Sequence, residues 1–409
     1  MRIGLFTDTY PPFINGVSTS VEMLKNALEK KGHDVYLVTV NESSVKYNYD
    51  EKNHILRVPS IPIGWYNYRM SGTYPIRGIN IIKKWKLDVI HSHTELGIGI
   101  IARVVSKQFN IPLVHTYHTM YEDYTHYVAH GHLKHTSKTA LKYLTEFYCD
   151  KTATELIVPT AKTYNLFKEK YRFERNIHII PSGIEVDRFF AENVDNKEVQ
   201  TLKKALGITK NDFVMLFVGR LASEKNVEFL LDLEEKLLKK YKNIKLLIVG
   251  DGPDKEKYEE ISQEKKIDTN TIFTGKVAWD DMPLYYHLAN IFITASITET
   301  QGLTVIEAMA SELAPFCIDD PAFLSMCTDE LNSVIFKDLD DCYKKVIEFY
   351  GNKEKQKRLN SQARIQSEHL SSARYADSVL EVYEHAIKEN HNNRYGIISA
   401  ISNRIKKDK

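Results

Sequence analysis

The chain has 409 residues, 43% hydrophobic and 27% charged, which excludes a small disulfide-stapled module and a largely disordered or collagen-like protein. Its 55 basic and 54 acidic residues leave a net charge of +1, which excludes the overall basic field expected of a protein that binds nucleic acid. The balance is uneven along the chain, because residues 1–185 carry 23 basic and 17 acidic groups and the remainder carries 32 and 37.

Short apolar segments alternate with amphipathic ones from the start of the chain. Residues 3–8 (IGLFTD) and 33–40 (HDVYLVTV) are typical of buried strands, and the 3.6-residue periodicity of 17–31 predicts a helix with Gly32 at its C-terminal cap. The alternation continues through KLDVIHSH, LGIGIIARVVSKQF, IPLVHTYH, ELIVPT, AKTYNLFKEKY and NIHIIPSG. Such repeated units predict an α/β domain with a parallel, doubly wound sheet over residues 1–185.

A second series of the same kind begins near residue 200. The segments DFVMLFVG, IKLLIVG, TIFTG, NIFITAS, APFCID and SVIF are strand-like, and helical segments such as VEFLLDLEEKLLKKY separate them. We therefore expect a second Rossmann-like domain over residues 200–372, followed by a long polar helix and a basic tail at 391–409. Because doubly wound sheets bind ligands beyond the carboxyl ends of their strands, we expect two such domains to face each other across a ligand-binding cleft.

The loop after the first strand, TDTYPPFINGVS, ends in Asn15 and Gly16 at the start of a helix. Gly16 would let the backbone approach a phosphate, and the free N–H groups of a helix N-terminus bind anions. An ordinary Asn-Gly turn is the alternative. The glycine fingerprint GxGxxG is absent, which disfavours an NAD-dependent enzyme.

A pair of cations follows the first strand of the second series. The segment VGRLASEKN places Arg220 and Lys225 just beyond the carboxyl end of this strand. An arginine can hold two phosphate oxygens and a lysine adds a point charge, so this pair could stabilise a departing diphosphate without a metal. Two solvated surface cations are the alternative.

Two carboxylates occupy the segment ASITETQGLTVIEAMA. Glu299 lies in a polar loop that turns at Gly302, and Glu307 lies one turn inside a helix that begins near Leu303. Carboxylates accept hydrogen bonds from sugar hydroxyls, and backbone N–H groups of the loop can bind the same ring. Stabilisation by the helix dipole would explain Glu307 alone.

Taken together, NGV near residue 16, VGRLASEKN, IVGDGP and two glutamates separated by seven residues resemble the retaining GT-B glycosyltransferases that use nucleotide sugars. The resemblance covers nearly the whole chain. The segments FTDTYPPFINGVSTS, HTYHTMYEDY, IIPSGIEVDRF and TETQGLTVIEAMA most resemble the bacterial 1,2-diacylglycerol 3-glucosyltransferases, which make monoglucosyldiacylglycerol from UDP-glucose. In this fold a helix such as 373–390 packs back on the N-terminal, acceptor-binding domain, and the C-terminal domain binds the nucleotide sugar.

For the donor, the resemblance implies that Gly16, Arg220 and Lys225 bind the diphosphate. Glu307 would accept hydroxyl groups of the ribose, and Glu299 would hold the transferred sugar. The donor site would be completed by the backbone at further positions, namely Gly250, Gly302 and Leu303. The resemblance implies no cofactor and no bound metal.

For the reaction, the resemblance implies that His118 lies nearest the reacting carbon. Retention in this family is attributed to attack on the face that the diphosphate leaves, so we expect positioning and charge stabilisation rather than a protein nucleophile. The catalytic residues would be His118, Glu299, Arg220 and Lys225. The family usually continues after this helix with a small residue, Gly and Pro-Val, whereas SELAPF (311–316) stands here and leaves the start of the next strand in doubt.

Histidines are concentrated in one part of the chain, with eight of the fifteen between residues 91 and 135. Structural zinc usually requires cysteine or tight histidine pairs with a carboxylate, so this clustering alone does not predict a metal. The four cysteines form no CxxC pair and are too sparse for a disulfide framework, which favours a reducing cytoplasm.

Residues 120–148 combine lysines every four positions (134, 138 and 142) with tyrosines every three (121, 124 and 127). This face could rest on anionic lipid, or it could be a solvated lysine stripe beside packed tyrosines. The resemblance and the positive charge of residues 1–185 favour peripheral membrane contact. The basic tail could add a weak anchor or be a frayed terminus, and no segment reaches the ~18 apolar residues that cross a bilayer.

We therefore expect a UDP-sugar-dependent hexosyltransferase that moves a hexose, expected to be glucose, to 1,2-diacylglycerol in glycolipid synthesis. It would work in the cytoplasm, at the inner face of the cell membrane, with no nucleic-acid partner. The main alternative keeps the donor and changes the acceptor to a polysaccharide, a teichoic acid, a protein or a small molecule. Another alternative is a non-catalytic GT-B partner protein.

Overall fold

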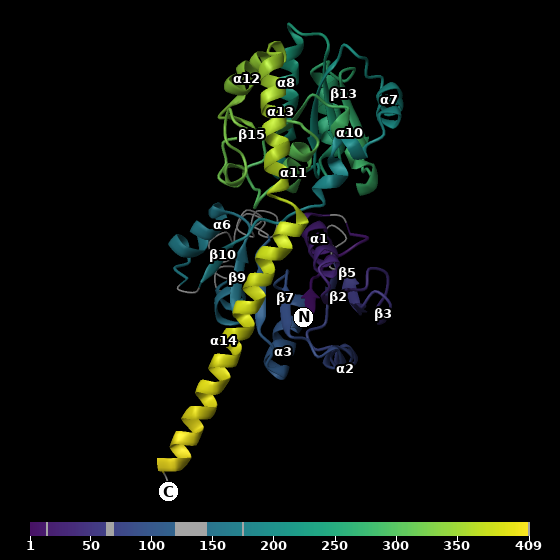
Figure 1. Cartoon of the computed structure of the whole chain (residues 1–409). Coiled ribbons are helices and arrows are strands. Elements are labelled where there is room, and N and C mark those ends of the chain that lie inside the picture. Colours follow the sequence, from purple (N-terminus) through teal and green to yellow (C-terminus); the bar gives the residue numbers. More distant parts are fainter. Residues whose placement is uncertain (14, 63–68, 119–144, 174–175, 408–409) are drawn as a thin grey trace, which may run out of the picture. The chain divides into compact units, whose positions relative to one another are not determined.

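The computed structural model describes residues 1–13, 15–62, 69–118, 145–173 and 176–407 (Figure 1). The chain forms two compact units. Unit 1 comprises Met1–Gly183 and Ser372–Lys409, and unit 2 comprises Ile184–Ser371. Each unit has its own sheet with helices on both faces, so the two doubly wound α/β folds that the alternation predicted are confirmed.

Unit 1 is built on an eight-stranded sheet of order β10-β9-β8-β7-β1-β2-β4-β3, parallel except for the antiparallel pair β3–β4. Its elements are β1 Arg2–Phe6, α1 Gly16–Lys30, β2 Asp34–Val40, β3 Asn48–Asp50, β4 Ile55–Val58, β5 Ser60–Pro62, β6 Arg69–Ser71, α2 Ile76–Trp85, β7 Val89–Ser92, α3 Ile98–Phe109, β8 Leu113–Thr116, the π-helical η1 Glu146–Lys151, β9 Glu155–Val158, α6 Ala161–Asn165, the π-helical η2 Leu166–Lys170, β10 Ile177–Ile179 and α14 Ser372–Lys407.

The first helix has the ends that its sequence predicts. Asn15 caps α1, since its side-chain oxygen accepts a hydrogen bond from the Ser18 N–H at 2.9 Å. The helix ends at Lys30 and Lys31 is its C-cap. Gly32 follows with φ +83°, a left-handed conformation that glycine adopts without steric cost. Apolar side chains of α1 such as Leu24 pack against the sheet, in one core with Leu5 of β1.

The C-terminal helix α14 completes the core of unit 1. Its buried residues recur at helical spacing, including Tyr375, Val379, Tyr383 and Ala386, and they pack in the same cluster as α1. Figure 1 shows α14 as the long yellow helix that reaches the C-terminus. The helix extends to Lys407, so the residues expected to form a separate basic tail continue α14 instead.

Unit 2 is built on a six-stranded parallel sheet of order β13-β12-β11-β14-β15-β16. Its elements are η3 Val186–Phe189, η4 Ala191–Asn193, α7 Asn196–Ala205, β11 Phe213–Val218, η5 Ser223–Lys225, α8 Val227–Leu238, β12 Ile244–Val249, α9 Lys255–Glu264, β13 Thr271–Gly275, η6 Trp279–Asp281, α10 Met282–His287, β14 Ile291–Thr294, α11 Leu303–Ala310, β15 Pro315–Ile318, η7 Phe323–Ser325, β16 Val334–Phe336, α12 Leu339–Gly351 and α13 Lys353–Glu368.

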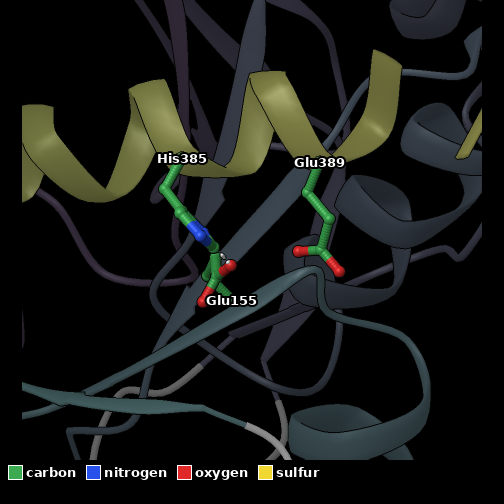
Figure 2. A group of neighbouring side chains, drawn as sticks. All are labelled: Glu155, His385 and Glu389. Atoms are coloured by element: carbon green, nitrogen blue, oxygen red, sulfur yellow. Dashed lines mark hydrogen bonds and ion pairs between the residues drawn. The ribbon is translucent and has the colours of Figure 1, made fainter. Parts of the chain in front are cut away.

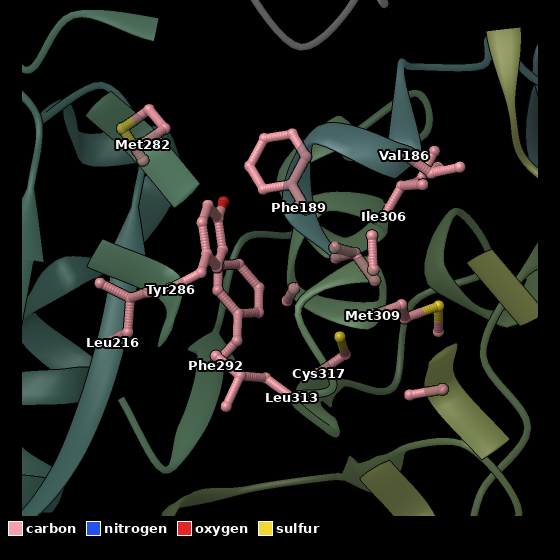
Figure 3. Packing of buried hydrophobic residues seen from close by; sticks show 14 of the residues in the cluster. Val186, Phe189, Leu216, Met282, Tyr286, Phe292, Ile306, Met309, Leu313 and Cys317 are labelled. Carbon is pink, nitrogen blue, oxygen red and sulfur yellow. The ribbon is translucent and has the colours of Figure 1, made fainter. Parts of the chain in front are cut away.

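The central strand β11 is apolar throughout because both faces of the sheet are covered. Val214 and Leu216 pack on the side of α10 and α11, whereas Met215 and Phe217 pack on the side of α8 and α12. Figure 3 shows the first of these cores, in which Leu216 and Phe292 of the sheet meet side chains of α10 and α11.

Unit 2 begins earlier in the chain than residue 200. Ile184, Val186 and Phe189 are buried in its core, because two short 3-10 turns carry this segment across α11. The apolar periodicity lapses here in the sequence because such turns bury single side chains rather than a continuous face.

The unusual sequence after α11 changes only the end of that helix. Glu312 takes the left-handed conformation at φ +57°, where the family usually has glycine, and β15 begins at Pro315. A residue with a Cβ costs roughly 1 kcal/mol in this conformation, which the fold can sustain. The register of β15 with β14 is regular, so the doubt about this strand is removed.

The two segments expected to contact a membrane are largely outside the described residues. These are residues 119–144, which make up most of the tyrosine–lysine segment, and the side chains of the C-terminal basic residues. The four cysteines, expected to form no disulfide framework, are free and buried. Within the described part of the chain, no helix combines the length and the apolar character that crossing a membrane demands.

Candidate active site

The strand order of unit 2 reverses between β11 and β14, which makes the carboxyl edge of the sheet there a candidate ligand site. From β11 the chain moves outward to β12 and β13, and it then returns to β14 on the other side of β11. Doubly wound sheets bind ligands at such a reversal. Arg220 and Lys225 follow β11 and Glu299 follows β14, so the structure brings these predicted residues to the reversal from both strands.

Lys225 and Glu299 form an ion pair between Nζ and Oε1, although 74 residues separate them in the sequence. Their side chains are 19% and 21% exposed, so the pair lies at the surface of the unit without being fully solvated. A lysine and a carboxylate in contact can bind the two ends of a ligand that carries both an anionic group and hydroxyl groups.

Hydrogen bonds hold together the two loops that carry this pair. Asn226 follows η5 in the left-handed conformation, and its side chain donates to the carbonyl of Ala295 at 3.4 Å. The hydroxyls of Ser296 and Thr298 both donate to the carbonyl of Glu224, at 3.3 and 3.5 Å. The positions of Lys225 and Glu299 are therefore set by backbone contacts as well as by their own ion pair.

Two of the predicted glycines are required by their surroundings. A Cβ on Gly250, which has φ +145°, would lie 1.8 Å from the carbonyl oxygen of Gly219. Gly302 has φ +87° and caps α11, and a Cβ there would lie 2.9 Å from the ring of Phe323. These glycines let backbone loops approach closely at the carboxyl edge, and Leu303 begins α11 directly after the second of them.

Glu307 lies in the second turn of α11 and is buried, with 6% of the residue exposed. Tyr286 of α10 donates a hydrogen bond from its hydroxyl to Oε2 of Glu307 at 2.7 Å. Burial raises the pKa of Glu307 to about 7, and the hydrogen bond from Tyr286 partly opposes this rise. The charge of Glu307 therefore changes near neutral pH, and the sequence contains no signal that predicts this.

The sheet of unit 1 reverses between β1 and β7 in the same manner. Gly16 is the first residue of α1, directly after the loop that follows β1; it is exposed, and a Cβ at this position would have no heavy atom within 4 Å. His118 follows β8, the next strand beyond β7. Open space beside Gly16 is compatible with a ligand that approaches the backbone there.

His118 pairs with a second histidine that the sequence did not single out. The His93 Nδ1 and His118 Nε2 atoms are 3.0 Å apart, and the two rings stack with centroids 5.3 Å apart. Desolvation lowers the pKa of His118 to about 4, so the imidazole is neutral at physiological pH. A neutral His118 can accept a hydrogen bond from a hydroxyl group but cannot act as a cationic anchor.

Behind His118 lies a network of buried polar side chains. His91 contacts the hydroxyl of Tyr383 at 2.7 Å and that of Thr116 at 2.6 Å, and His115 contacts Glu95 at 3.3 Å. Desolvation lowers the pKa of His91 and of His115, so both are neutral. The network holds the end of β7 to β8 and to α14.

Asp8 is another residue at this edge that the sequence reasoning missed. Its Oδ1 accepts a hydrogen bond from the N–H of Ile98 at 2.9 Å, and burial raises its pKa to about 7. Gly97 passes so close that a Cβ on it would lie 2.4 Å from this oxygen. The segment HSHTE after an apolar strand could have indicated such a polar cluster, because it places ionisable residues at the end of β7.

The structure also contains a group that could hold a metal ion. Among the residues described, Glu155, His385 and Glu389 are the three that bring possible ligand atoms together, all within 4.8 Å of one another (Figure 2). They lie in unit 1 at the first residue of β9 and on α14, whereas His118 and Gly16 follow the ends of strands.

Comparison with protein families matches both halves of the chain. Residues 14–188 match the family described as Glycosyltransferase Family 4, and residues 198–366 match Glycosyl transferases group 1. The chain is 35% identical over 398 residues to the alpha-monoglucosyldiacylglycerol synthase of Acholeplasma laidlawii, with 95% of this chain and 98% of that protein covered.

Two further similarities extend this result. The protein of the same name from Streptococcus pneumoniae is 35% identical over 340 residues, which cover 82% of this chain and 75% of that protein. Among solved structures, HepE of Anabaena in complex with UDP-glucose superimposes with a TM-score of 0.73 over 94% of this chain and all of HepE, at 15% identity. At 15% identity, the similarity to HepE shows a shared fold.

Proposed function

Because this chain belongs to the GT-B glycosyltransferases of group 1 and family 4, we propose that it transfers glucose from UDP-glucose to a hydroxyl of 1,2-diacylglycerol. The observation that carries the proposal is the similarity, over nearly the full length of both chains, to a protein named alpha-monoglucosyldiacylglycerol synthase. That name specifies both glucose and diacylglycerol. The fold shared with a structure that contains UDP-glucose supports the choice of donor.

The proposed reaction retains configuration at the anomeric carbon. UDP-glucose carries its glucose in α linkage, and the name of the relative specifies an alpha product. The bond between the anomeric carbon and the diphosphate oxygen breaks, and the acceptor oxygen bonds to the same face of that carbon. The proton of the acceptor hydroxyl passes to an oxygen of the departing diphosphate, so no protein nucleophile is consumed.

Unit 2 supplies the groups that bind the donor in this proposal. Arg220 and Lys225 neutralise the charge that develops on the diphosphate, which is the type of electrostatic stabilisation that contributes most to many enzymes. Glu299 accepts hydrogen bonds from hydroxyls of the glucose, and the ribose hydroxyls donate to Glu307. The two cations neutralise the leaving group themselves, so the proposed transfer does not require a metal.

The proposal also gives roles to two groups of unit 1. The backbone N–H groups at the start of α1, beside Gly16, bind phosphate oxygens of the donor. His118, neutral and held by His93, accepts a hydrogen bond from a hydroxyl of the reacting sugar. Diacylglycerol is a membrane lipid, so we place the protein in the cytoplasm as a peripheral protein at the inner face of the membrane.

The test of this proposal is release of UDP from UDP-glucose, measured with and without diacylglycerol in anionic vesicles. We expect release to require the lipid and a glucosylated lipid to appear in equal amount. Slow release that is indifferent to lipid would contradict the acceptor and point to a polysaccharide, protein or small-molecule acceptor. Failure to bind UDP-glucose would contradict the enzymatic proposal and favour a non-catalytic partner protein.

The pKa of Glu307 makes donor binding depend on pH. Below pH about 7 the Glu307 carboxyl becomes protonated, and a neutral carboxyl is a weaker acceptor for ribose hydroxyls, so affinity for UDP-glucose should fall as the pH falls. The Tyr286→Phe variant loses the hydrogen bond that lowers this pKa. We expect the midpoint of the pH profile to move upward by about one unit, as measured by calorimetry between pH 5.5 and 8.5.

The matched control for this variant is Tyr285→Phe. Tyr285 is the neighbouring residue of α10 and has no hydrogen bond to Glu307 among those observed. Its profile should coincide with that of the wild type. A Tyr286→Phe profile that also coincides would show that Glu307 does not control binding of the donor.

A further inference from the structure

Unit 1 contains a buried carboxylate that the proposed reaction does not use. Glu155 is the first residue of β9, and only 1% of it is exposed. Side chains alternate along a strand, and Ile157 packs in the cluster formed with α14, so Glu155 faces the same helix. Burying a charged group is costly unless other groups satisfy it.

Two histidines satisfy both oxygens of this carboxylate. The Nδ1 atom of His385, on α14, lies 2.7 Å from Oε1 of Glu155, and the Nε2 atom of His178, on β10, lies 2.8 Å from Oε2. Burial acts to raise the pKa of Glu155, but the hydrogen bonds and the electrostatic interactions with the two histidines together hold it below its usual value. Glu155 is therefore a carboxylate within a nitrogen-rich environment.

A second carboxylate completes the group from the solvent side. Glu389 lies one helical turn after His385 on α14, and Figure 2 shows both side chains projecting from α14 on the side of Glu155. Ligand atoms of Glu155, His385 and Glu389 all lie within 4.8 Å of one another. His385 is half exposed and Glu389 is exposed, so both can adjust their side-chain torsions.

This set of donors suits a divalent transition-metal ion. Zinc takes imidazole nitrogen and carboxylate oxygen at about 2.0–2.2 Å, which places neighbouring ligand atoms roughly 3.3 Å apart in a tetrahedral site. The distance of 2.7 Å between His385 Nδ1 and Glu155 Oε1 is already shorter than this, and the ligand atom of Glu389, within 4.8 Å of the other two, has to move closer. With neutral imidazole the two carboxylates carry a charge of −2, which a divalent cation balances.

We propose that Glu155, His385 and Glu389 bind a divalent transition-metal ion of the zinc class, and that His178 orients Glu155 for this role. A histidine and an acid four residues apart on a helix present ligands on one face, a spacing that helical zinc sites use. The site lies at the amino end of β9, whereas ligands of parallel sheets bind at the carboxyl ends. The ion therefore has a structural role, joining α14 to the sheet of unit 1.

The test is calorimetric titration of the chelator-treated, full-length protein with zinc chloride in a buffer that does not bind zinc. We expect one zinc ion per chain and a thermal midpoint that rises with zinc concentration. His385→Ala and Glu389→Gln should each weaken binding by at least about tenfold. Glu389→Gln keeps both histidine contacts of the buried Glu155, so it tests zinc binding even where His385→Ala lowers stability.

Two control variants make the result specific to this site. Glu381→Gln changes an exposed acid one turn before His385 on the same helix, and His369→Ala changes an exposed histidine of unit 2, so neither should alter zinc binding. Absence of saturable binding in the wild type would overturn the proposal. So would equal binding by His385→Ala, because the ion would then be held elsewhere, for example by the histidines around His118.

Discussion

The Glu299→Gln variant is expected to lose glucosyl transfer by about 100- to 1000-fold while it folds normally and binds UDP with unchanged affinity. The substitution keeps the size of the side chain and removes the charge that pairs with Lys225. In the proposed site Glu299 holds the transferred sugar, so its loss misplaces the anomeric carbon without removing contacts to the nucleotide. UDP release in the presence of diacylglycerol measures the rate, and calorimetry measures UDP affinity.

The control for this variant is Asp340→Asn. Asp340 forms an ion pair with Lys236 elsewhere in unit 2, so this substitution removes a lysine–carboxylate pair of the same kind at a distance from the reversal of the sheet. Its transfer rate should equal that of the wild type, since an exposed ion pair contributes little to stability. Normal transfer by Glu299→Gln would eliminate Glu299 from the donor site.

The Lys225→Ala variant is expected to lower kcat by about 100- to 1000-fold and also to weaken UDP binding by about tenfold. Lys225 contributes positive charge to the diphosphate in both the bound donor and the departing product, so its removal affects binding as well as catalysis. This combination distinguishes Lys225 from Glu299, whose loss should leave UDP affinity intact. Steady-state kinetics and UDP calorimetry on the same preparations separate the two effects.

The ion pair between Lys225 and Glu299 also predicts how the double variant behaves. Because Lys225 and Glu299 are in contact, the double variant should lose less activity than the product of the two single losses. Lys236→Ala removes the lysine of the comparison pair and should change neither kcat nor UDP affinity. Strictly multiplicative losses would contradict a shared function of Lys225 and Glu299.

The sequence alone determined the strands and helices of both units because their apolar periodicity is a local property. Strands such as β11 are apolar at every position, and this pattern is unambiguous when both faces of a sheet are covered. The loop residues Arg220, Lys225 and Glu299 could be placed at the carboxyl ends of strands for the same reason. Their roles came from resemblance, since charged loop residues are common on any surface.

The boundary between the two units and the end of helix α11 could not be predicted from the sequence in the same way. The start of unit 2 at Ile184 depends on single side chains that 3-10 turns bury against α11, and no periodic pattern marks such contacts. Glu312 occupies a left-handed position that the sequence would assign to glycine. In both cases tertiary packing outweighs the local preference of the chain.

The contacts between distant polar groups, and the extent to which these groups are removed from water, depend on the folded chain as a whole. The Lys225–Glu299 pair joins residues 74 positions apart, and the contact between Glu155 and His385 spans 230 positions. The shifted pKa of Glu307 and the neutral state of His118 follow from burial, which depends on every element packed around them. Local sequence sets the periodicity of each element, whereas desolvation and long-range pairing arise only when the elements assemble.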